Sequence, residues 1–320
     1  MPTLLLDRNA IRTLMNMADV ISVVEEAFKM CGEGRGKMPG KTYLSLERGD
    51  FRAMPAALPG CAGVKWVNVH PQNRSLGLPS IMGILIYSDP ETGYPLAIMD
   101  ATEITAYRTG AAAAIASKYL ARPDSHTVGI IGAGFQAHTQ ILAHAALFDL
   151  ISMNVFDVSE AAVDKLMRSL PQFPIRNCSI QEAVASDIVC TLTPSRSPII
   201  KREWIKPGTH INAVGADAPG KQELDPSIVK EGTVVVDDLE QASGSGEINV
   251  PIQKGIYSIN EVHGTLAELV VGKKKGRGNS QDITVFDSTG IAVEDMAVAR
   301  LLFEKAQQRG GYPSVDLVGA

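Results

Sequence analysis

A short strand, a glycine turn and a helix follow one another between His126 and Ala137. The apolar run Val128–Ile131 is typical of a buried strand, and apolar residues recur at helical spacing from Gln136 to Leu147. Between them, Gly132 permits a tight turn, and Gly134 lets a phosphate approach the backbone at the positive end of the helix. Ala137 stands where a third glycine is common, and it is small enough for close packing. The stretch predicts a dinucleotide-binding turn.

Apolar strands and helices alternate along the rest of this region. Further strands are expected at 153–156, 188–192, 210–214, 233–236 and 283–286, and a helix at 160–170 is expected to be capped by Ser159. This alternation predicts an α/β fold with a Rossmann doubly wound parallel sheet. We place this NAD-binding domain at residues 118–300.

The first hundred residues have a different pattern. A strand is expected at 1–6, an amphipathic helix at 17–30, and five strands at 41–46, 51–55, 62–68, 81–87 and 95–99. An alanine-rich helix follows at 101–120. We therefore expect a smaller α+β domain at residues 1–117, with residues 301–320 packing back on it.

Composition restricts the partners and the compartment. With 45% hydrophobic residues, 20% charged residues and a net charge of -5, the chain is an ordinary globular protein with no general affinity for nucleic acid. The four cysteines form no metal-ligand pattern, and no segment has the profile of a signal peptide or a membrane span. We expect a cytoplasmic protein that binds no metal, nucleic acid or membrane.

Asp157 follows the strand after the glycine turn, 23 residues beyond Gly134. A carboxylate there accepts hydrogen bonds from the ribose hydroxyls of NAD and repels the extra phosphate of NADP. Neither Val158 nor Ser159 supplies a compensating cation. NAD is therefore the expected cofactor, and the alternative is that Asp157 serves only in a turn or cap.

Two more segments follow predicted strands at the same edge of the sheet. Ligands of doubly wound folds bind beyond the carboxyl ends of the strands, so Thr191–Ser195 should line the nucleotide groove. Asp217 lies in the next such loop, where the nicotinamide end is expected. The competing interpretations are a Ser/Pro turn without a ligand for the first segment and a structural aspartate for the second.

The first domain carries three cations in or near its strands, Lys41, Arg52 and Lys65. Lys65 interrupts the apolar segment Gly63–Val69. A buried lysine must be paired, and loss of hydration lowers its pKa toward the range that suits proton transfer. The alternative is an outward-facing lysine on a half-exposed strand.

Several motifs together resemble the ornithine cyclodeaminase and mu-crystallin family, most closely its archaeal-type alanine dehydrogenases. The resemblance covers nearly the whole chain. It rests on Arg52–Pro55, Gly63–Asn68 with His70-Pro71, Glu91–Pro95, Tyr107–Ala111, the Gly132 turn, Gly215–Lys221, Gly246–Ile248 and Phe286–Gly290.

The resemblance implies a homodimer that joins through the strands of the first domain, which then serves for substrate binding and dimerisation. It implies that Lys41 and Lys65 hold the substrate carboxylate, that Asp217 lies beside the amine, and that Arg108 and Thr109 contact cofactor phosphates. The full set of expected cofactor-binding residues is Arg108, Thr109, Gly132, Gly134, Phe135, Gln136, Asp157, Ser159, Thr193, Ser195, Gly215, Ala216 and Ser288.

The residue at position 52 distinguishes between the activities that the family resemblance implies. Cyclodeaminases carry an acid here that holds the distal amine of ornithine, whereas a guanidinium repels that amine and suits a carboxylate. We therefore expect NAD-dependent, reversible oxidative deamination of L-alanine, with Lys65 and Asp217 as catalytic residues and Lys41 and Arg52 orienting the carboxylate. The alternatives are a reductase of a cyclic ketimine or dicarboxylic imine, an ornithine cyclodeaminase, and a non-catalytic binding protein like mu-crystallin.

Overall fold

The computed structural model describes residues 2–319, and the chain divides into two compact units. The first unit comprises Met1–Arg108 with Ile291–Ala320, and the second unit comprises Thr109–Gly290. The boundary between the units falls inside helix α3 (Ala101–Leu120), after Arg108, whereas the sequence predicts it after residue 117. The chain returns to the first unit at Ile291, whereas the sequence predicts that return at residue 301.

A seven-stranded mixed sheet forms the first unit, in the order β17-β1-β6-β5-β4-β3-β2. The successive strands from β2 to β6 pair antiparallel with one another, β1 pairs parallel with β6, and β17 pairs antiparallel with β1. The strands are β1 (Thr3–Leu6), β2 (Thr42–Leu46), β3 (Gly49–Leu58), β4 (Cys61–Val69), β5 (Ile81–Ser88), β6 (Pro95–Asp100) and β17 (Ser314–Val315). The expected strand at 1–6 is β1, and Met1 lies outside the described residues.

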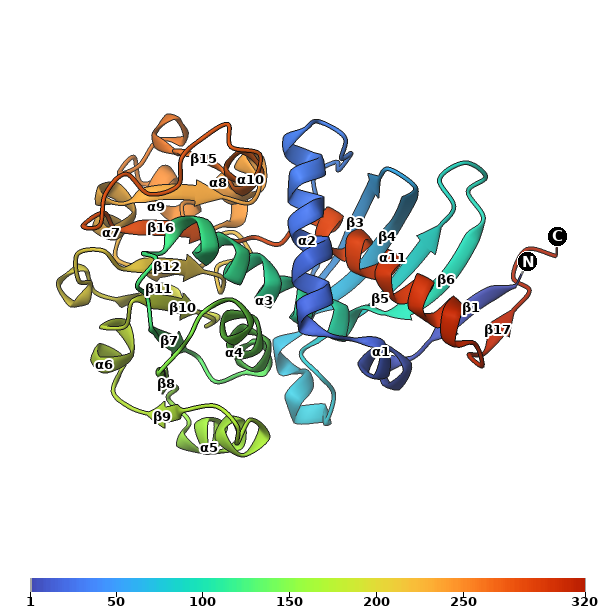
Figure 1. Ribbon diagram of the computed structural model, residues 1–320, viewed down its shortest axis with the longest axis horizontal. Helices are drawn as coiled ribbons and strands as arrows, with labels where there is room; N and C mark the ends of the chain where they lie inside the picture. The colour runs from blue at the N-terminus through green and yellow to red at the C-terminus, as the bar shows by residue number, and fades with distance from the viewer. Residues whose placement is uncertain (1, 320) are drawn as a thin grey trace. The chain divides into compact units, whose positions relative to one another are not determined.

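The long helix α11 (Ala292–Arg309) packs on this sheet, and the long helix α2 (Met17–Gly32) packs against α11; they are drawn red and blue in Figure 1. Side chains of β3 alternate accordingly, since Arg52, Met54, Ala56 and Leu58 are buried while their neighbours are partly exposed. The remaining helices of the unit are α1 (Arg8–Leu14), which Asp7 caps through its side chain, and the short helix Pro71–Leu76.

An eight-stranded parallel sheet forms the second unit, in the order β15-β14-β16-β12-β10-β7-β8-β9 (Figure 1). The expected Rossmann doubly wound sheet is therefore confirmed. Its strands are β7 (Thr127–Ile131), β8 (Ser152–Phe156), β9 (Ile175–Asn177), β10 (Ile188–Thr191), β12 (His210–Ala213), β14 (Thr233–Val236), β15 (Gly264–Thr265) and β16 (Thr284–Asp287).

The strand order of the parallel sheet reverses between β7 and β10, and doubly wound folds bind their ligands at such a point.

Helices and a small extra sheet complete the second unit. The other elements are α4 (Phe135–Leu147), α5 (Glu160–Ser169), α6 (Ile180–Val184), α7 (Pro226–Glu231), α8 (Leu239–Ser245), α9 (Asn249–Gln253), α10 (Leu266–Val270), the short helices Arg202–Trp204 and Ile259–Glu261, and the paired strands β11 (Arg196–Ile200) and β13 (Gln222–Leu224).

Candidate functional site

The glycine turn lies between β7 and α4, as the sequence predicts. Gly132 has φ +105°, a backbone conformation that side chains disfavour, and its N–H donates to the carbonyl of Phe156 at 2.8 Å. Gly134 is the N-cap residue of α4, and a side chain added there would meet no atom within 4 Å. Phe135 begins the helix and is half exposed. The turn thus leaves open space in front of a helix N-terminus, as a phosphate requires.

Asp157 contacts this turn directly. One carboxylate oxygen accepts a hydrogen bond from the N–H of Ala133 at 2.7 Å, and the other accepts from the N–H of Ser159 at 2.8 Å. Ser159 occupies the N-cap position of α5, but its side chain makes no capping hydrogen bond, so the expected cap is wrong in that respect. Each oxygen of Asp157 keeps a second lone pair for a hydroxyl donor.

Residues beyond β10, β12 and β16 meet at one edge of the sheet, because these strands are parallel neighbours. They are Thr193, Ser195, Gly215, Ala216 and Ser288. The buried hydroxyl of Ser288 and, at the start of α4, the amide oxygen of Gln136 are among the buried side-chain atoms of the described residues that have no hydrogen-bond partner. Buried polar atoms are normally satisfied, so these two are available to a polar ligand.

Glu223, on β13, connects two of these loops. Its carboxylate accepts hydrogen bonds from the hydroxyl of Thr191 at 2.7 Å, from the N–H and hydroxyl of Thr193 at 2.7 Å each, and from the N–H of Gly215 at 2.9 Å. The side chain is completely buried, which raises the pKa of Glu223, while the four donors oppose that rise. Glu223 therefore holds the ends of β10 and β12 in register.

Asp217 lies in the loop after β12 and is partly exposed. The ammonium of Lys221, four residues further on, donates to Asp217 Oδ1 at 2.5 Å. The loop therefore holds the carboxylate in a defined position, beside a cation of its own.

Lys65, on β4, is buried with only 1% of its surface exposed, so the outward-facing alternative is wrong. Its ammonium donates to Asp295 Oδ2 at 2.6 Å and to the hydroxyl of Thr105 at 3.4 Å. Arg108 completes the cluster, because its guanidinium lies 2.9 Å from Glu294 Oε2 and 3.2 Å from Asp295 Oδ1. Two buried cations thus face two buried carboxylates.

These surroundings give Lys65 an unusual acidity. Burial and the positive charges of Arg108 and Lys41 lower the pKa of Lys65 to about 7, against the opposite effect of Asp295. An amine with this pKa exists in both forms near neutral pH, so it can accept and donate protons.

Arg52 lies on the same face of the sheet as Lys65. Met54 is directly opposite Lys65 across β3 and β4, and Arg52 is two residues from Met54, which brings its side chain to that face. Arg52 is 6% exposed and lies over the ring of Tyr43, at 5.3 Å from its centroid. Its Nε donates to Asp50 Oδ1 at 2.7 Å.

A family model described as the ornithine cyclodeaminase/mu-crystallin family matches residues 1–310. The chain belongs to this family. It is 49% identical to the alanine dehydrogenase of Archaeoglobus fulgidus over 309 residues, which are 96% of this chain and 96% of that protein. Among residues 2–319, no helix combines the length and the apolar character needed to cross a membrane.

Solved structures of the family have the same fold. An archaeal alanine dehydrogenase dimer with bound NAD superposes with a TM-score of 0.97 at 46% identity, covering 99% of this chain and all of that chain. The Thermococcus litoralis Delta(1)-pyrroline-2-carboxylate reductase, solved with NADH and L-proline, gives a TM-score of 0.94 at 39% identity, covering 98% of this chain and all of that one.

The structure groups the predicted family residues into two sets, one in each unit. Lys41, Arg52, Lys65 and Arg108 share the first unit, and in it Arg108 pairs with carboxylates of α11. The glycine turn and the strand-end residues belong to the second unit, as does Thr109, whose carbonyl accepts a bond from Gln140. The phosphate contact expected of Arg108 and Thr109 stays a prediction.

Sequence reasoning missed four carboxylates, Asp50, Glu223, Glu294 and Asp295. A signal was present for the last two, because Glu294-Asp295 interrupts an otherwise apolar stretch at the start of α11. Buried acids in such a stretch need cations, and a buried lysine needs an acid. Within residues 2–319 there is no group of three metal-ligating side chains.

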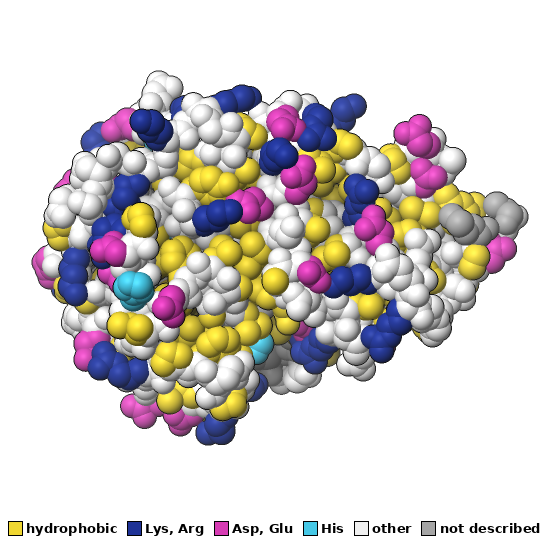
Figure 2. All heavy atoms as spheres, viewed as in Figure 1, with side chains coloured by type: hydrophobic (Ala, Val, Ile, Leu, Met, Phe, Trp, Pro, Cys, Tyr) yellow, Lys and Arg dark blue, Asp and Glu magenta, His cyan; other side chains and the backbone are white. Residues whose placement is uncertain are grey.

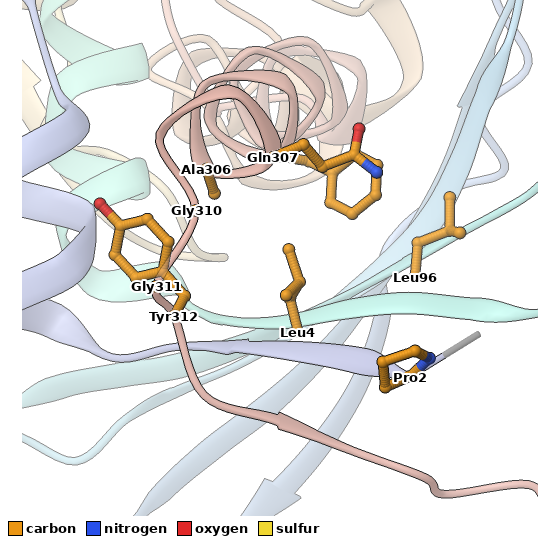
Figure 3. A pocket seen from close by; sticks show the side chains of 9 residues that line it. Pro2, Leu4, Leu96, Ala306, Gln307, Gly310, Gly311 and Tyr312 are labelled. Atoms are coloured by element: carbon orange, nitrogen blue, oxygen red, sulfur yellow. The ribbon is translucent and has the colours of Figure 1, made fainter.

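Surface features elsewhere are less specific. On the face seen in Figure 2, positive and negative side chains are interspersed. A hollow of about 330 Å³ lies in the first unit and is lined by Leu4, Leu96, Phe303 and Tyr312 among others. Figure 3 labels Leu4, Leu96 and Tyr312 around it. None of the predicted site residues lines it.

Proposed function

We propose that this protein catalyses the reversible NAD-dependent oxidative deamination of L-alanine. L-alanine, NAD⁺ and water give pyruvate, ammonium, NADH and a proton. The observation that carries the proposal is the buried cluster of Lys65, Arg108, Glu294 and Asp295, in which the pKa of Lys65 is lowered to about 7, in a chain 49% identical to an alanine dehydrogenase.

The charges of the first unit suit a substrate that carries a carboxylate. Four cations, Lys41, Arg52, Lys65 and Arg108, accompany three carboxylates, those of Asp50, Glu294 and Asp295. With every group ionised, the difference is one positive charge (four minus three). With Lys65 protonated, this excess of one positive charge favours a substrate that carries a carboxylate.

The residues of the second unit fit NAD. The open backbone at Gly132 and Gly134 would hold the pyrophosphate, Asp157 the adenosine ribose, and Gln136 and Ser288 have unsatisfied polar atoms for further contacts. The carboxylate of Asp157 favours NAD over NADP. When bound, NAD supplies the hydride acceptor.

Lys65 acts as the general acid/base. Its neutral form takes the proton from the water that adds to the imino acid, and its ammonium form returns a proton to the departing amine. Lys41 and Arg52 contact the substrate, and Asp217, held by Lys221, interacts with the amine or the attacking water. Together these residues orient the reactants and move protons, which are the protein's tasks in a dehydrogenase.

A second candidate is the reduction of a cyclic imino acid. The Thermococcus litoralis pyrroline-carboxylate reductase, 39% identical, favours it. The same acid/base lysine suits both reactions, so only substrate tests separate them. Arg52 disfavours the cyclisation of ornithine as the reaction, because its guanidinium repels the protonated distal amine of ornithine.

A homodimer is the proposed assembly, and the cytoplasm the proposed compartment. The face of the first unit's sheet opposite the buried cations exposes Leu44, Leu46, Trp66 and Ile84 by 40–52% each. A contiguous apolar face of this kind marks an interaction surface. The related archaeal enzyme with bound NAD is a dimer.

NADH oxidation with a panel of carbonyl and imine substrates tests the proposed reaction. Pyruvate with ammonium should support oxidation, NADPH should replace NADH poorly, and pyrroline-2-carboxylate, tested separately without ammonium, should react slowly or not at all. Faster turnover of the cyclic imine would establish the second candidate instead. Proline formation from ornithine without net NADH production would establish a cyclodeaminase.

Lys65→Ala tests the assigned acid/base. Turnover of alanine should fall by roughly 10²- to 10⁴-fold, the usual contribution of a general acid/base, while the NADH dissociation constant changes little. Lys29→Met, on the exposed face of α2, is the matched control and should behave as wild type. Near-normal alanine oxidation by Lys65→Ala would exclude the role.

A further inference from the structure

Arg52 and Asp50 form an ion pair within one strand, β3. The two residues are two positions apart, so both side chains point to the face that carries Lys65. Arg52 Nε lies 2.7 Å from Asp50 Oδ1, and Nη2 lies 3.4 Å from Oδ2. The exposed fractions of the side chains are 7% for Arg52 and 22% for Asp50, so the pair is largely shielded from water.

The ion pair with Asp50 reduces the hydrogen-bond donors and the positive charge that Arg52 has available for a ligand. A guanidinium binds a carboxylate best through two parallel N–H donors, and Asp50 takes one such edge, that of Nε and Nη2. The pair carries no net charge. A second anionic group brought to this place would gain little from Arg52 and would be repelled by Asp50, more strongly than in water because the pair is shielded.

Lys65 has two further cations near it in the first unit. Lys41 and Arg108 are close enough to Lys65 for their charges to affect its acidity. Arg52 is offset from the residue opposite Lys65 by two positions along β3, roughly 6–7 Å at the rise of an extended strand. The pair therefore lies on the same face of the sheet as Lys65 but is displaced from it along the strand direction.

We propose that Asp50 determines substrate specificity. By neutralising Arg52, it restricts the site to amino acids with a small uncharged side chain and rejects dicarboxylic ones such as L-aspartate. The inference rests on the proposed function, which it deepens by assigning the substrate class to a particular pair.

Asp50→Asn tests the assignment in the complete enzyme. The amide keeps an oxygen that can accept from Arg52 Nε but removes the negative charge. The ratio of kcat/KM for L-aspartate to that for L-alanine should rise by about tenfold or more, as expected when a like charge beside the ligand is removed. Asp50→Glu retains the charge and should restore a ratio near that of wild type, and Glu47→Gln, an exposed neighbour in the same hairpin, should not change it.

A purely structural role for Asp50 would reduce both activities together and leave the ratio unchanged, which would overturn the proposal. Binding of propionate and succinate, measured by calorimetry on the NAD-loaded protein, gives a readout that needs no turnover. Wild type should bind propionate more tightly, and Asp50→Asn should gain at least about tenfold in succinate affinity relative to propionate. Equal gains for the two acids, or binding of neither, would also overturn the inference. Inactivity of wild type on alanine with the predicted binding pattern would refute only the proposed reaction.

Discussion

At the scale of single residues, the pairing of Lys65 with Asp295 sets the acidity on which the proposed chemistry depends. Asp295 is completely buried and lies 2.6 Å from the ammonium, so its negative charge stabilises the protonated form. Burial and Arg108 act in the opposite direction and prevail. The pKa of Lys65 is therefore the result of two opposing effects, and the lowering effect is the larger.

Asp295→Asn should shift the pH dependence of alanine oxidation to lower pH. The sign follows because Asp295 raises the pKa of Lys65, so its removal takes that pKa below about 7 and populates the neutral base at more acidic pH. We expect the ascending limb of kcat/KM against pH to move by roughly one unit or more. Glu304→Gln, an exposed carboxylate on the same helix, should leave the limb in place. A limb that stays fixed or moves to higher pH would contradict the role of Asp295.

At the scale of elements, local pattern predicts most of this fold. The glycine turn, the parallel strands and the long helices follow from periodicity and capping, which act over a few residues. Contacts between side chains that are far apart in the sequence produce no comparable local pattern. Lys65 and Asp295 are 230 residues apart, so a buried lysine was predictable and its partner was not. Asp50 lies between the expected strands 41–46 and 51–55, but β3 begins at Gly49 because pairing with β2 and β4 extends the strand.

Glu223 shows how one side chain can organise two elements. Glu223→Gln would place an amide NH₂ against the N–H or hydroxyl donors of Thr191, Thr193 and Gly215, which leaves buried donors unsatisfied. We expect a loss of stability of roughly 1–3 kcal/mol, and a rise of about tenfold in the NADH dissociation constant. Thermal unfolding and NADH fluorescence titration measure the two effects.

The control for this variant is Glu240→Gln, an exposed glutamate of α8 in the same unit. It should match wild type in both measurements. Unchanged NADH affinity in Glu223→Gln, with or without a loss of stability, would mean that the loops at the ends of β10 and β12 do not depend on this carboxylate for binding the cofactor.

At the scale of the whole molecule, the sheet of the first unit has two faces of different character. One face carries the buried cations beneath α11, and the other exposes Leu44, Leu46, Trp66 and Ile84. Trp66 also stacks on Phe51, with ring centroids 5.2 Å apart. Strict alternation along a strand produces this division, and it explains why a polar lysine and an exposed tryptophan are neighbours in sequence.

Trp66→Asp should therefore convert the proposed homodimer to a monomer. In a two-fold symmetric interface each substitution occurs twice, and a central aromatic residue typically contributes about 2 kcal/mol or more, so we expect dimer dissociation to increase by at least about 10²-fold. Sedimentation velocity across a micromolar concentration series measures it, with circular dichroism to establish that the variant is folded. Ile151→Asp changes an equally apolar side chain, 70% exposed in the second unit, and should remain dimeric.

Two results would refute this assignment of the interface. A wild-type protein that sediments as a monomer would remove the dimer itself. A folded Trp66→Asp variant that stays dimeric would place the interface elsewhere, because an apolar interface centred on Trp66 would have to bury two unpaired aspartates, one from each protomer. Burial of an ionised carboxylate without a cation or hydrogen-bond donors costs more free energy than such an interface supplies at that position.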